Sequence, residues 1–187
     1  IMLVFPQFDP VAISVGPISI HWYGVMYIIA FGGAWVLANY RRNKIGNHWS
    51  SEQISDLVFY GAMGAVLGGR IGSVFFYNID RFLDDPLWLF RVWEGGMSFH
   101  GGFIGVLIAM FLYSKSINRK FWGTVDFIAP CVPFGIGAGR LGNFIGGELW
   151  GRPTDAPWGM IFSHVDDLPR HPSQLYEIAL EGIVLFI

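Results

Sequence analysis

The sequence has little charge and almost no cysteine. Lys, Arg, Asp and Glu make up 14% of its 187 residues, whereas a soluble domain usually carries about a quarter. The net charge of −2 lacks the basic excess typical of nucleic-acid-binding proteins, so nucleic acid is not an expected partner. The single cysteine, Cys131, excludes a disulfide within the chain, and its apolar surroundings predict an inert thiol. His164 and the pair Asp166–Asp167 lack metal-ligand spacing, so we expect no metal and no other cofactor.

Long apolar runs take the place of charge. Hydrophobic residues make up 53% of the chain, and the mean hydropathy is +0.46. About five apolar segments each approach the roughly 20 residues that a helix needs to cross a bilayer. The pattern therefore predicts an all-α, polytopic membrane bundle. The segments lie at about 19–39, 54–78, 98–114, 122–144 and from 173 to the end of the chain.

The distribution of charge between the loops predicts the orientation. The loops 40–52 and 114–121 are short and basic, whereas the segments 80–97 and 146–172 are longer and mix basic with acidic residues. By the positive-inside rule, the short loops face the cytoplasm and the N-terminus lies outside. We expect one transmembrane domain over residues 1–187, with 146–172 as an outer-side loop or small head. The inner basic residues are Arg41, Arg42, Lys44, Lys115, Arg119 and Lys120.

The two ends of the sequence carry further expectations. Basic residues follow the first apolar run instead of preceding it, which argues against a cleaved signal peptide and for a true first span. At the other end the sequence stops within the apolar run LEGIVLFI. From this we expect additional helices beyond the last residue.

Small residues recur every four positions in three of the predicted spans. Such rows let helix backbones approach closely, and packing alone accounts for most of these residues. We expect a compact bundle from them. The rows are Gly64, Gly68 and Gly72; Gly101, Gly105 and Ala109; and Ala138, Gly142 and Gly146.

Two arginines occur in similar surroundings near the outer ends of two spans. The stretch GRIGSVF at 69–75 resembles GRLGNFI at 139–145. A helical rise of about 1.5 Å per residue places Arg70 and Arg140 about 24–27 Å up a hydrocarbon core about 30 Å thick. Together they would form one cationic zone in the outer leaflet.

Arg140 is the strongest candidate for chemistry. An arginine within the membrane costs at least about 2.5–3.5 kcal/mol, so it needs a partner. Asn143 lies one turn further along, and Glu148 follows a Gly-Gly break that is expected to end the helix and leave backbone amides open to an anion. A planar guanidinium is suited to bidentate binding of phosphate. The alternative is a structural ion pair, or a side chain that extends to the membrane interface.

Polar residues at the outer ends of other spans complete the candidate site. His100 opens the third span in FHGGFIGV, and a neutral imidazole there could act as a base; the alternative is an ordinary interfacial histidine. Tyr23 follows His-Trp in the first span; the alternative is an ordinary aromatic residue of the membrane–water interface, where Trp and Tyr are common without a catalytic role. Gln174 and Glu177 lie one turn apart in RHPSQLYE, which opens the fifth segment. The topology brings all of these to one side of the membrane, which predicts a site for an anionic, membrane-resident substrate.

An enzyme and a small-anion transporter both fit such a site. A transporter should carry its polar groups near the midplane, on broken helices with access from both faces. In this sequence the polar groups gather at the outer boundary, and the inner halves of the spans are apolar. The pattern therefore favours an enzyme.

At this point the motifs resemble those of a known family, the bacterial prolipoprotein diacylglyceryl transferases. The resemblance covers essentially the whole chain, with the motifs in the same order. Within the most specific motif Arg140, Asn143, Glu148 and Gly151 fit, whereas Gly146 stands where the family signature has Asn. The motifs are HWYG at 21–24, HGGFIG at 100–105, GRLGNFIGGELWG at 139–151 and RHPSQLYE at 170–177.

The resemblance implies a reaction and a location. The diacylglyceryl group of phosphatidylglycerol would move to the lipobox cysteine thiol of a preprolipoprotein, forming a thioether and releasing glycerol phosphate. The implied fold is a bundle of about seven helices with a periplasmic head. The enzyme would lie in the bacterial inner membrane, with phosphatidylglycerol, the preprolipoprotein signal peptide and the bilayer as partners.

The resemblance also implies roles for residues. The substrate thiol must lose its proton before it attacks, and His100 would take that proton, bind phosphate, or both. The leaving phosphate gains charge that Arg140 would stabilise, with Tyr23 as a further catalytic residue. The other expected contributors are Asn143, Glu148, Gly151, Arg70, Gly101 and Gly102 for binding of phosphatidylglycerol, with Gln174 and Glu177 in support. The alternative is another phospholipid-headgroup transferase or, less favoured, a small-anion transporter.

Overall fold

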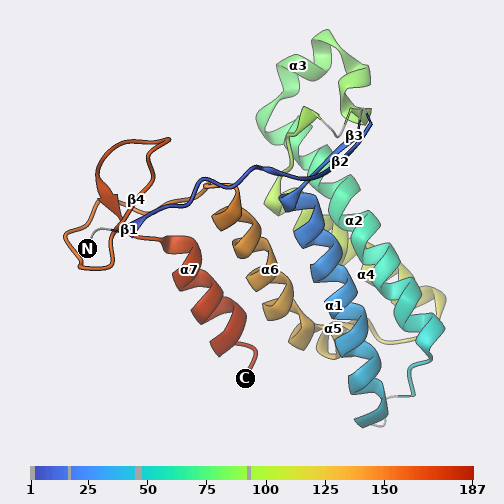
Figure 1. Cartoon of the computed structure of the whole chain (residues 1–187). Coiled ribbons are helices and arrows are strands. Elements are labelled where there is room, and N and C mark those ends of the chain that lie inside the picture. The colour runs from blue at the N-terminus through green and yellow to red at the C-terminus, as the bar shows by residue number, and fades with distance from the viewer. Residues whose placement is uncertain (1–2, 17, 45–47, 92–93) are drawn as a thin grey trace. The chain divides into compact units, whose positions relative to one another are not determined.

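The computed structural model describes residues 3–16, 18–44, 48–91 and 94–187 (Figure 1). Its contacts divide the chain into two compact units. The first unit comprises Ile1–Leu37 and Pro130–Ile187, and the second comprises Ala38–Ala129, so one boundary falls within the first helix. The expectation of a single transmembrane domain over residues 1–187 stays a prediction.

The described residues contain four helices that are long and apolar enough to cross a membrane. Their large apolar side chains are widely exposed; Ile28, Phe59 and Ile108 are each more than half exposed. Such side chains suit a lipid environment, and the architecture confirms an all-α membrane bundle. The four helical stretches are Trp22–Arg42, Ser51–Tyr77, Phe99–Ser116 and Phe121–Ile145.

The second unit is built on α2 (Ser51–Tyr77) and α4 (Phe99–Ser116), which lie side by side (Figure 1). Helix α2 begins earlier than the apolar pattern predicts, because Ser50 and Gln53 form a capping box at its start. Between α2 and α4 the chain forms the short helix α3 (Ile79–Asp84) and the 3-10 helix η1 (Pro86–Phe90). These two short helices occupy the segment that the sequence predicts on the outer side.

Helices α2 and α4 approach so closely that their backbones touch. A Cβ atom added at Gly68 would lie 2.3 Å from the carbonyl oxygen of Gly101, and one added at Gly105 would lie 2.1 Å from that of Gly64. The predicted close packing is therefore confirmed for these two rows. Glycine is required because any side chain there would collide with main-chain atoms.

The fourth predicted span is not one continuous helix. It consists of α5 (Phe121–Ile128), a 3-10 turn η3 (Ala129–Cys131) and α6 (Val132–Ile145). Two prolines, Pro130 and Pro133, remove backbone donors and clash with the preceding turn, so the α-helical hydrogen bonds are interrupted there. The predicted span at about 122–144 is present as Phe121–Ile145, with this break in its middle.

The fifth predicted span is helical over a shorter length. Helix α7 (Ser173–Glu177) continues into a π-helical stretch, η4 (Ile178–Val184). The two together are shorter than the roughly 20 residues that a membrane span requires. The described residues hold four helices of spanning length, and the fifth predicted segment, from 173 on, is cut short because the sequence ends at residue 187.

In the first unit, α6 contacts both α1 (Trp22–Lys44) and η4. A Cβ atom added at Gly33 of α1 would lie 1.9 Å from Cε1 of Phe134. On η4, Gly182 faces Gly137, and a Cβ atom at Gly137 would lie 3.2 Å from the Cα atom of Gly182. Small residues thus bring three helical segments together, but Gly33, Gly137 and Gly182 lie outside the predicted row; within that row, a Cβ atom at Gly142 would lie 3.2 Å from Cγ of Met26 on α1.

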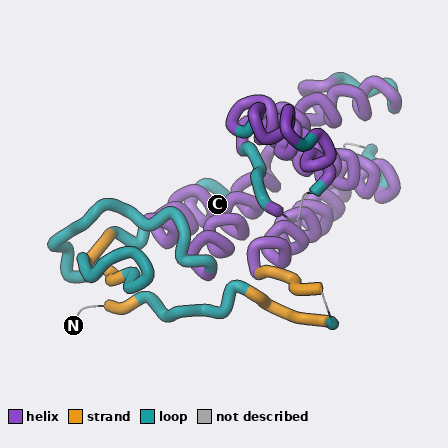
Figure 2. Tube along the Cα trace, turned by 90° about the horizontal axis from the view of Figure 1, so that it is seen from above, coloured by secondary structure: helices purple, strands orange, loops and turns teal. Residues whose placement is uncertain are grey.

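Two small sheets in the first unit were not expected from the sequence. An antiparallel hairpin joins β2 (Val11–Val15) to β3 (Ile18–His21) just before α1. A second sheet pairs β1 (Leu3–Val4) in parallel with β4 (Met160–Ile161), which pairs antiparallel with β5 (Pro169–Arg170). Figure 2 shows these strands as short orange segments among long loops.

The second sheet covers a small apolar core. Phe5, Met160 and Phe162 are buried together, and Phe144 and Val165 pack against them. The rings of Phe5 and Phe162 stack with their centroids 5.1 Å apart. The segment 146–172, expected as an outer-side loop or head, is thus joined to the start of the chain by strand pairing and by this core.

The backbone contact between α2 and α4 predicts a stability effect. Gly68→Ala should destabilise the protein by about 1–3 kcal/mol, because the new methyl group would force two backbones apart. The matched control is Gly61→Ala on the same helix, where an added Cβ atom meets no atom within 4 Å. The control should be neutral or stabilise by up to about 1 kcal/mol. Unfolding in mixed micelles measures both; equal effects of the two changes would contradict the packing account.

Candidate functional site

Helix α6 ends in a turn that folds Glu148 back toward Asn143. Gly147 has a φ of +66°, a conformation that favours glycine. The amide of Gly147 donates to the carbonyl of Phe144 at 3.0 Å, and the amide of Glu148 donates to that of Asn143 at 2.9 Å. This pair of bonds is the Schellman motif. The predicted helix end at the Gly-Gly break is confirmed.

The turn does not leave its amides open to an anion. The amides of Gly147 and Glu148 are used within the motif, and the amide of Gly146 donates to the carbonyl of Gly142 at 2.9 Å. The expectation of an anion-binding nest at these glycines is therefore wrong.

Asn143 and Glu148 contact each other through their side chains. Asn143 Nδ2 donates to Glu148 Oε2 at 3.4 Å, and the Asn143 side chain is buried. Gly146 lies between them with helical dihedral angles, and a Cβ atom there would lie 3.7 Å from Cδ of Glu148. A side chain at position 146 would thus be a neighbour of Glu148, and this chain lacks it.

The start of α7 is attached to the loop that follows α6. Gln174 is 0% exposed, and its Nε2 donates to the carbonyl of Glu148. The amide of Gly151 donates to the carbonyl of His171 at 2.8 Å. A Cβ atom at Gly151 would lie 2.4 Å from Oγ of Ser173, so the two segments leave room only for glycine. The structure therefore brings Gln174, Gly151 and Glu148 together.

Arg140 pairs with two carboxylates on the last helical segment. Its Nε lies 2.9 Å from Oε2 of Glu177 and 3.8 Å from Oε2 of Glu181. The Arg140 side chain is 31% exposed, and Nε is its closest nitrogen to each of the two carboxylates. Glu181 was not predicted; its spacing of four residues from Glu177, which puts both on one helix face, is the signal that could have found it. The structure contains the ion pair that the sequence leaves open as an alternative.

Tyr23 lies in the first turn of α1, against α6. A Cβ atom at Gly142 would lie 3.4 Å from Cδ2 of Tyr23, and the ring is 46% exposed. The first unit thus gathers Tyr23 with the polar residues of α6, as expected for one site.

An apolar cavity adjoins Arg140 in the first unit. Its volume is about 360 Å³, and its walls come from α1, α6, η4 and the residues that follow η4, Phe186 and Ile187, with almost no polar surface. Leu141, the residue after Arg140, forms part of the wall. Arg140 itself does not line the cavity; Leu141 does, as do Ile178 and Gly182, which follow its ion-pair partners Glu177 and Glu181 in the sequence. Other lining residues include Met26, Ile29, Gly137, Ile178 and Ile183.

His100 belongs to the second unit, in the first turn of α4. The helix is capped by Ser98, whose Oγ accepts a hydrogen bond from the amide of Gly101 at 3.2 Å. His100 is exposed, and its ring lies 5.7 Å from that of Phe99 in an edge-on arrangement. Gly101 and Gly102 pack against α2, where a Cβ atom at Gly102 would lie 3.3 Å from the carbonyl oxygen of Ala65. Any role of these two glycines in substrate binding stays a prediction.

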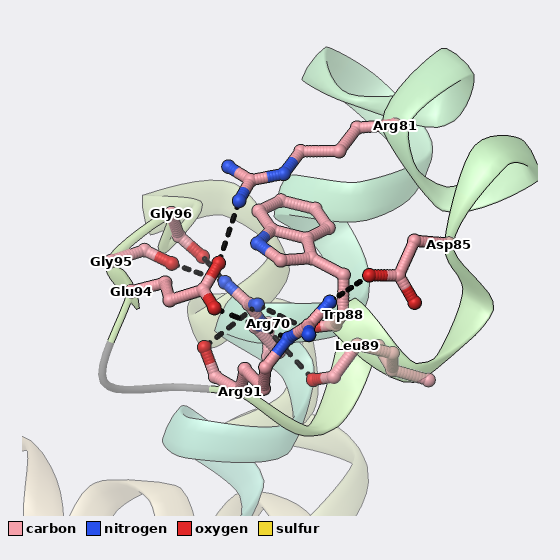
Figure 3. A network of polar contacts seen from close by, with 9 residues as sticks. All are labelled: Arg70, Arg81, Asp85, Trp88, Leu89, Arg91, Glu94, Gly95 and Gly96. Carbon is pink, nitrogen blue, oxygen red and sulfur yellow. Dashed lines mark hydrogen bonds and ion pairs between the residues drawn. The ribbon is translucent and has the colours of Figure 1, made fainter.

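Arg70 has partners that differ from those expected (Figure 3). Arg70 is 2% exposed, and all five of its N–H groups donate to backbone carbonyls. Two of these carbonyls belong to η1, and the other three belong to residues that follow it. Its guanidinium also lies 4.1 Å from the centroid of the Trp88 ring. No donor of Arg70 is left for a phosphate in this arrangement. The accepting carbonyls belong to Trp88, Leu89, Arg91, Gly95 and Gly96.

Charged side chains surround this cage of carbonyls. Arg91 pairs with Asp85 and, at 3.2 Å, with Glu94. Arg81 pairs with Glu94 at 2.6 Å, and its guanidinium lies 4.4 Å from the Trp88 ring centroid. Figure 3 shows all of these groups around the buried Arg70. Ion pairs between side chains as exposed as these contribute little to the free energy of unfolding. The buried Arg70 is therefore the residue whose loss should destabilise this segment most.

The part of the chain that the structure describes has no group of three or more His, Cys, Asp or Glu residues that could hold a metal ion. The expectation that the protein uses no metal stays a prediction. Cys131 is buried at the break between α5 and α6, away from the surface.

The sequence is similar to one family of known proteins and to curated proteins that share a name. A family model described as prolipoprotein diacylglyceryl transferase matches residues 10–187. Three curated relatives carry the name phosphatidylglycerol–prolipoprotein diacylglyceryl transferase. The relative from Glaesserella parasuis serovar 5 (strain SH0165) is 60% identical over 98% of this chain and 69% of its own length. Those from Vibrio vulnificus (strain CMCP6) and Legionella pneumophila (strain Paris) are 62% and 56% identical over 98% and 100% of this chain, and 68% and 73% of their own lengths.

The ion pair in the 146–172 segment predicts a dependence of stability on pH. The Arg170 guanidinium beside Asp166 lowers the pKa of that carboxyl below its ordinary value of 3.8. A lowered pKa in the folded state stabilises the protein above the ordinary value, and this stabilisation is lost as the pH falls through the lower folded value. Asp166→Asn should therefore lower the melting temperature at about pH 6 and have less effect at about pH 3.

The control for this measurement is Asp167→Asn, which changes the adjacent exposed carboxylate. Its effect on the melting temperature should be small at both pH values. A loss of stability in Asp166→Asn that is the same at both pH values would contradict the role of the ion pair.

Proposed function

Because the chain belongs to the prolipoprotein diacylglyceryl transferase family, we propose that it transfers the diacylglyceryl group of phosphatidylglycerol to the lipobox cysteine thiol of a preprolipoprotein. The observation that carries the proposal is the match over residues 10–187, with relatives of that name 56–62% identical along nearly the whole chain. The protein is accordingly a transferase. The reaction is the first step by which a bacterial lipoprotein acquires its lipid.

The proposed step is a substitution at a glyceryl carbon. The cysteine sulfur forms a new C–S bond, and the bond between that carbon and the phosphate oxygen breaks, so that glycerol phosphate leaves. The thiol, with an ordinary pKa of about 8.5, must give its proton to a base before or during attack. The enzyme has to supply that base and stabilise the charge that develops on the departing phosphate.

Arg140 is the residue we assign to the phosphate. Its side chain is 31% exposed while it pairs with Glu177 and Glu181, so the guanidinium would be held by the carboxylates and still present donors to an anion. Asn143 and Glu148 contact each other one turn further along, and Gln174 and Gly151 hold the turn that carries Glu148. These four residues would position the lipid headgroup.

The apolar cavity beside Arg140 supports a lipid substrate. Acyl chains require an apolar wall, and the cavity of about 360 Å³ has almost no polar surface. Tyr23, packed against α6 near the same end, would complete the headgroup site. A phosphate at Arg140 with acyl chains along Leu141 and Met26 fits the chemistry of phosphatidylglycerol.

His100 is the residue we assign as the general base. It is exposed at the start of α4, where an imidazole can reach a substrate, and it is the kind of side chain that exchanges protons near neutral pH. The buried Cys131 is not needed, because the attacking thiol belongs to the substrate.

The proposed location is the bacterial inner membrane, with the N-terminus periplasmic and the site near the periplasmic leaflet. The helices of spanning length support a multi-pass membrane protein. The orientation rests on the basic loops at 40–52 and 114–121, which the positive-inside rule assigns to the cytoplasm.

Another phospholipid-headgroup transferase remains the alternative with the same site chemistry. A small-anion transporter gains no support from the broken helix between α5 and α6. The break consists of Ala129, Pro130 and Cys131, and none of these is a charged or polar group suited to an anion.

Reconstitution tests the roles of the site residues. In vesicles with phosphatidylglycerol and a lipobox peptide, Arg140→Ala should lower the transfer rate by about 10²–10³-fold, because the leaving phosphate loses its cation. His100→Ala should lower it by about 10²–10⁴-fold. The mass increase of the peptide by one diacylglyceryl unit measures transfer.

Cys131→Ser is the control in the same assay and should keep the activity. Loss of transfer in this variant would point to a covalent enzyme intermediate instead. Full activity of His100→Gln would show that His100 is not the base, and full activity of Arg140→Ala would remove Arg140 from the reaction.

A further inference from the structure

The segment between α2 and α4 is held to α2 by one buried side chain. Arg70 donates to two groups of carbonyls in this segment, one at residues 88–91 and the other at Gly95 and Gly96. A buried guanidinium must have its donors satisfied, and here the main chain satisfies all five. The carbonyls and Arg70 therefore depend on each other: without the guanidinium, several buried acceptors lose their partner.

The same turn of α2 also fixes the residues that lead into α4. The amide of Ser98 donates to the carbonyl of Gly69, the neighbour of Arg70, at 2.8 Å. A Cβ atom at Gly69 would lie 2.8 Å from Cε of Met97, and one at Gly72 would lie 3.2 Å from Cβ of Ser98. Residues 96–98 thus lie directly on α2, with Arg70 at their start and the helix cap at their end.

The cap then transmits this placement to His100. Ser98 Oγ accepts the amide of Gly101, which defines where α4 begins, and the carbonyl of Ser98 accepts the amide of Gly102 at 2.9 Å. His100 stands two residues after Ser98 in this capped first turn. If Gly96 or Ser98 shifted relative to α2, the imidazole of His100 would move with it.

We propose that Arg70 is a positioning residue for His100: its carbonyl cage fixes residues 88–91 and Gly95–Gly96 on α2 and so sets where the first turn of α4, with its imidazole, stands. Arg70 does not contact the substrate in this account. The inference rests on the proposed function of His100 as the base in diacylglyceryl transfer. A displacement of about 1 Å of a catalytic group can cost about 10²-fold in rate, so a distant anchor can control the chemical step.

The geometry distinguishes this role from a phosphate contact. An arginine that binds phosphate needs donors that point to an open space, whereas every N–H group of Arg70 points to a carbonyl of its own chain. Lysine cannot replace Arg70, because its ammonium group has only three N–H donors, all on one nitrogen atom. The five carbonyls are arranged around a planar guanidinium, and one nitrogen atom cannot donate to all of them.

The test compares Arg70→Lys with Arg81→Gln in the complete protein in vesicles with phosphatidylglycerol and a lipobox peptide. Arg81 pairs with Glu94 and lies over Trp88, but it is exposed and donates to none of the cage carbonyls, so it is the matched control. Arg70→Lys should lower kcat by about 10–100-fold with KM for phosphatidylglycerol within about twofold, because the base is displaced while the lipid site is intact. Arg81→Gln should change neither by more than about twofold.

Hydrogen exchange provides a second readout that does not depend on activity. In Arg70→Lys the amides of Ser98, Gly101 and Gly102 should exchange at least about tenfold faster than in the unsubstituted protein, because the start of α4 is no longer held. Arg81→Gln should leave their exchange unchanged.

Ser98→Ala tests the same link if Arg70→Lys does not fold. It removes the cap at the other end of the connection while the amide of residue 98 can still donate to Gly69. It should lower kcat about fivefold and again leave KM for phosphatidylglycerol within about twofold.

Each outcome decides the inference. An unchanged kcat in Arg70→Lys, or in Ser98→Ala if the first variant does not fold, overturns it. A rise in KM for phosphatidylglycerol with unchanged kcat also overturns it, because Arg70 would then contact the lipid. Absence of transfer by the unsubstituted protein defeats the proposed function instead, and unchanged exchange at residues 98–102 would separately show that Arg70 does not hold the start of α4.

Discussion

A guanidinium that is removed from water must have all its donors satisfied, and the placement of two arginines follows from this constraint. Arg70 meets it with main-chain carbonyls: five N–H groups, five acceptors, and an aromatic ring alongside. Arg140 is only partly removed from water: its side chain is 31% exposed, and it pairs with Glu177 and Glu181. One arginine is therefore closed to a ligand, while the other keeps donors that an anionic headgroup can use. The two similar sequence stretches around them have different chemistry for this reason.

The supporting structure lets the two arginines act in these ways. In the second unit, backbone contact between Gly68 and Gly101 fixes α4 on α2, and the carbonyl cage fixes the segment that precedes α4. In the first unit, the Schellman turn at Gly147 brings Glu148 to Asn143, and buried Gln174 attaches α7 to that turn. Both units use glycine where backbones meet, and both place polar side chains at helix ends. The proposed base is held by main-chain contacts, whereas Arg140 in the proposed phosphate site is held by its ion pairs with Glu177 and Glu181.

The sequence predicts what depends on local composition. The first four spans, the α2–α4 glycine contact and the helix end at Gly147 follow from apolar length, small-residue spacing and glycine conformation. The pairing of β1 with β4 could not be predicted, because two-residue strands obtain their partners from far along the chain. The cage around Arg70 escaped prediction because its acceptors are carbonyls, which every residue possesses. The open amides expected near Gly146 were wrong because the helix end satisfies its own donors.

The central claim is that the protein moves a diacylglyceryl unit from phosphatidylglycerol to a cysteine thiol, with Arg140 and the apolar cavity beside it as the lipid site. The most direct measurement compares the complete protein in vesicles that contain phosphatidylglycerol with the same protein in vesicles of phosphatidylethanolamine alone, with a lipobox peptide supplied to both. The account predicts that mass spectrometry finds one added diacylglyceryl unit on the peptide cysteine only in the first case, together with released glycerol phosphate. An unmodified peptide in both kinds of vesicle, or equal modification in both, would contradict it.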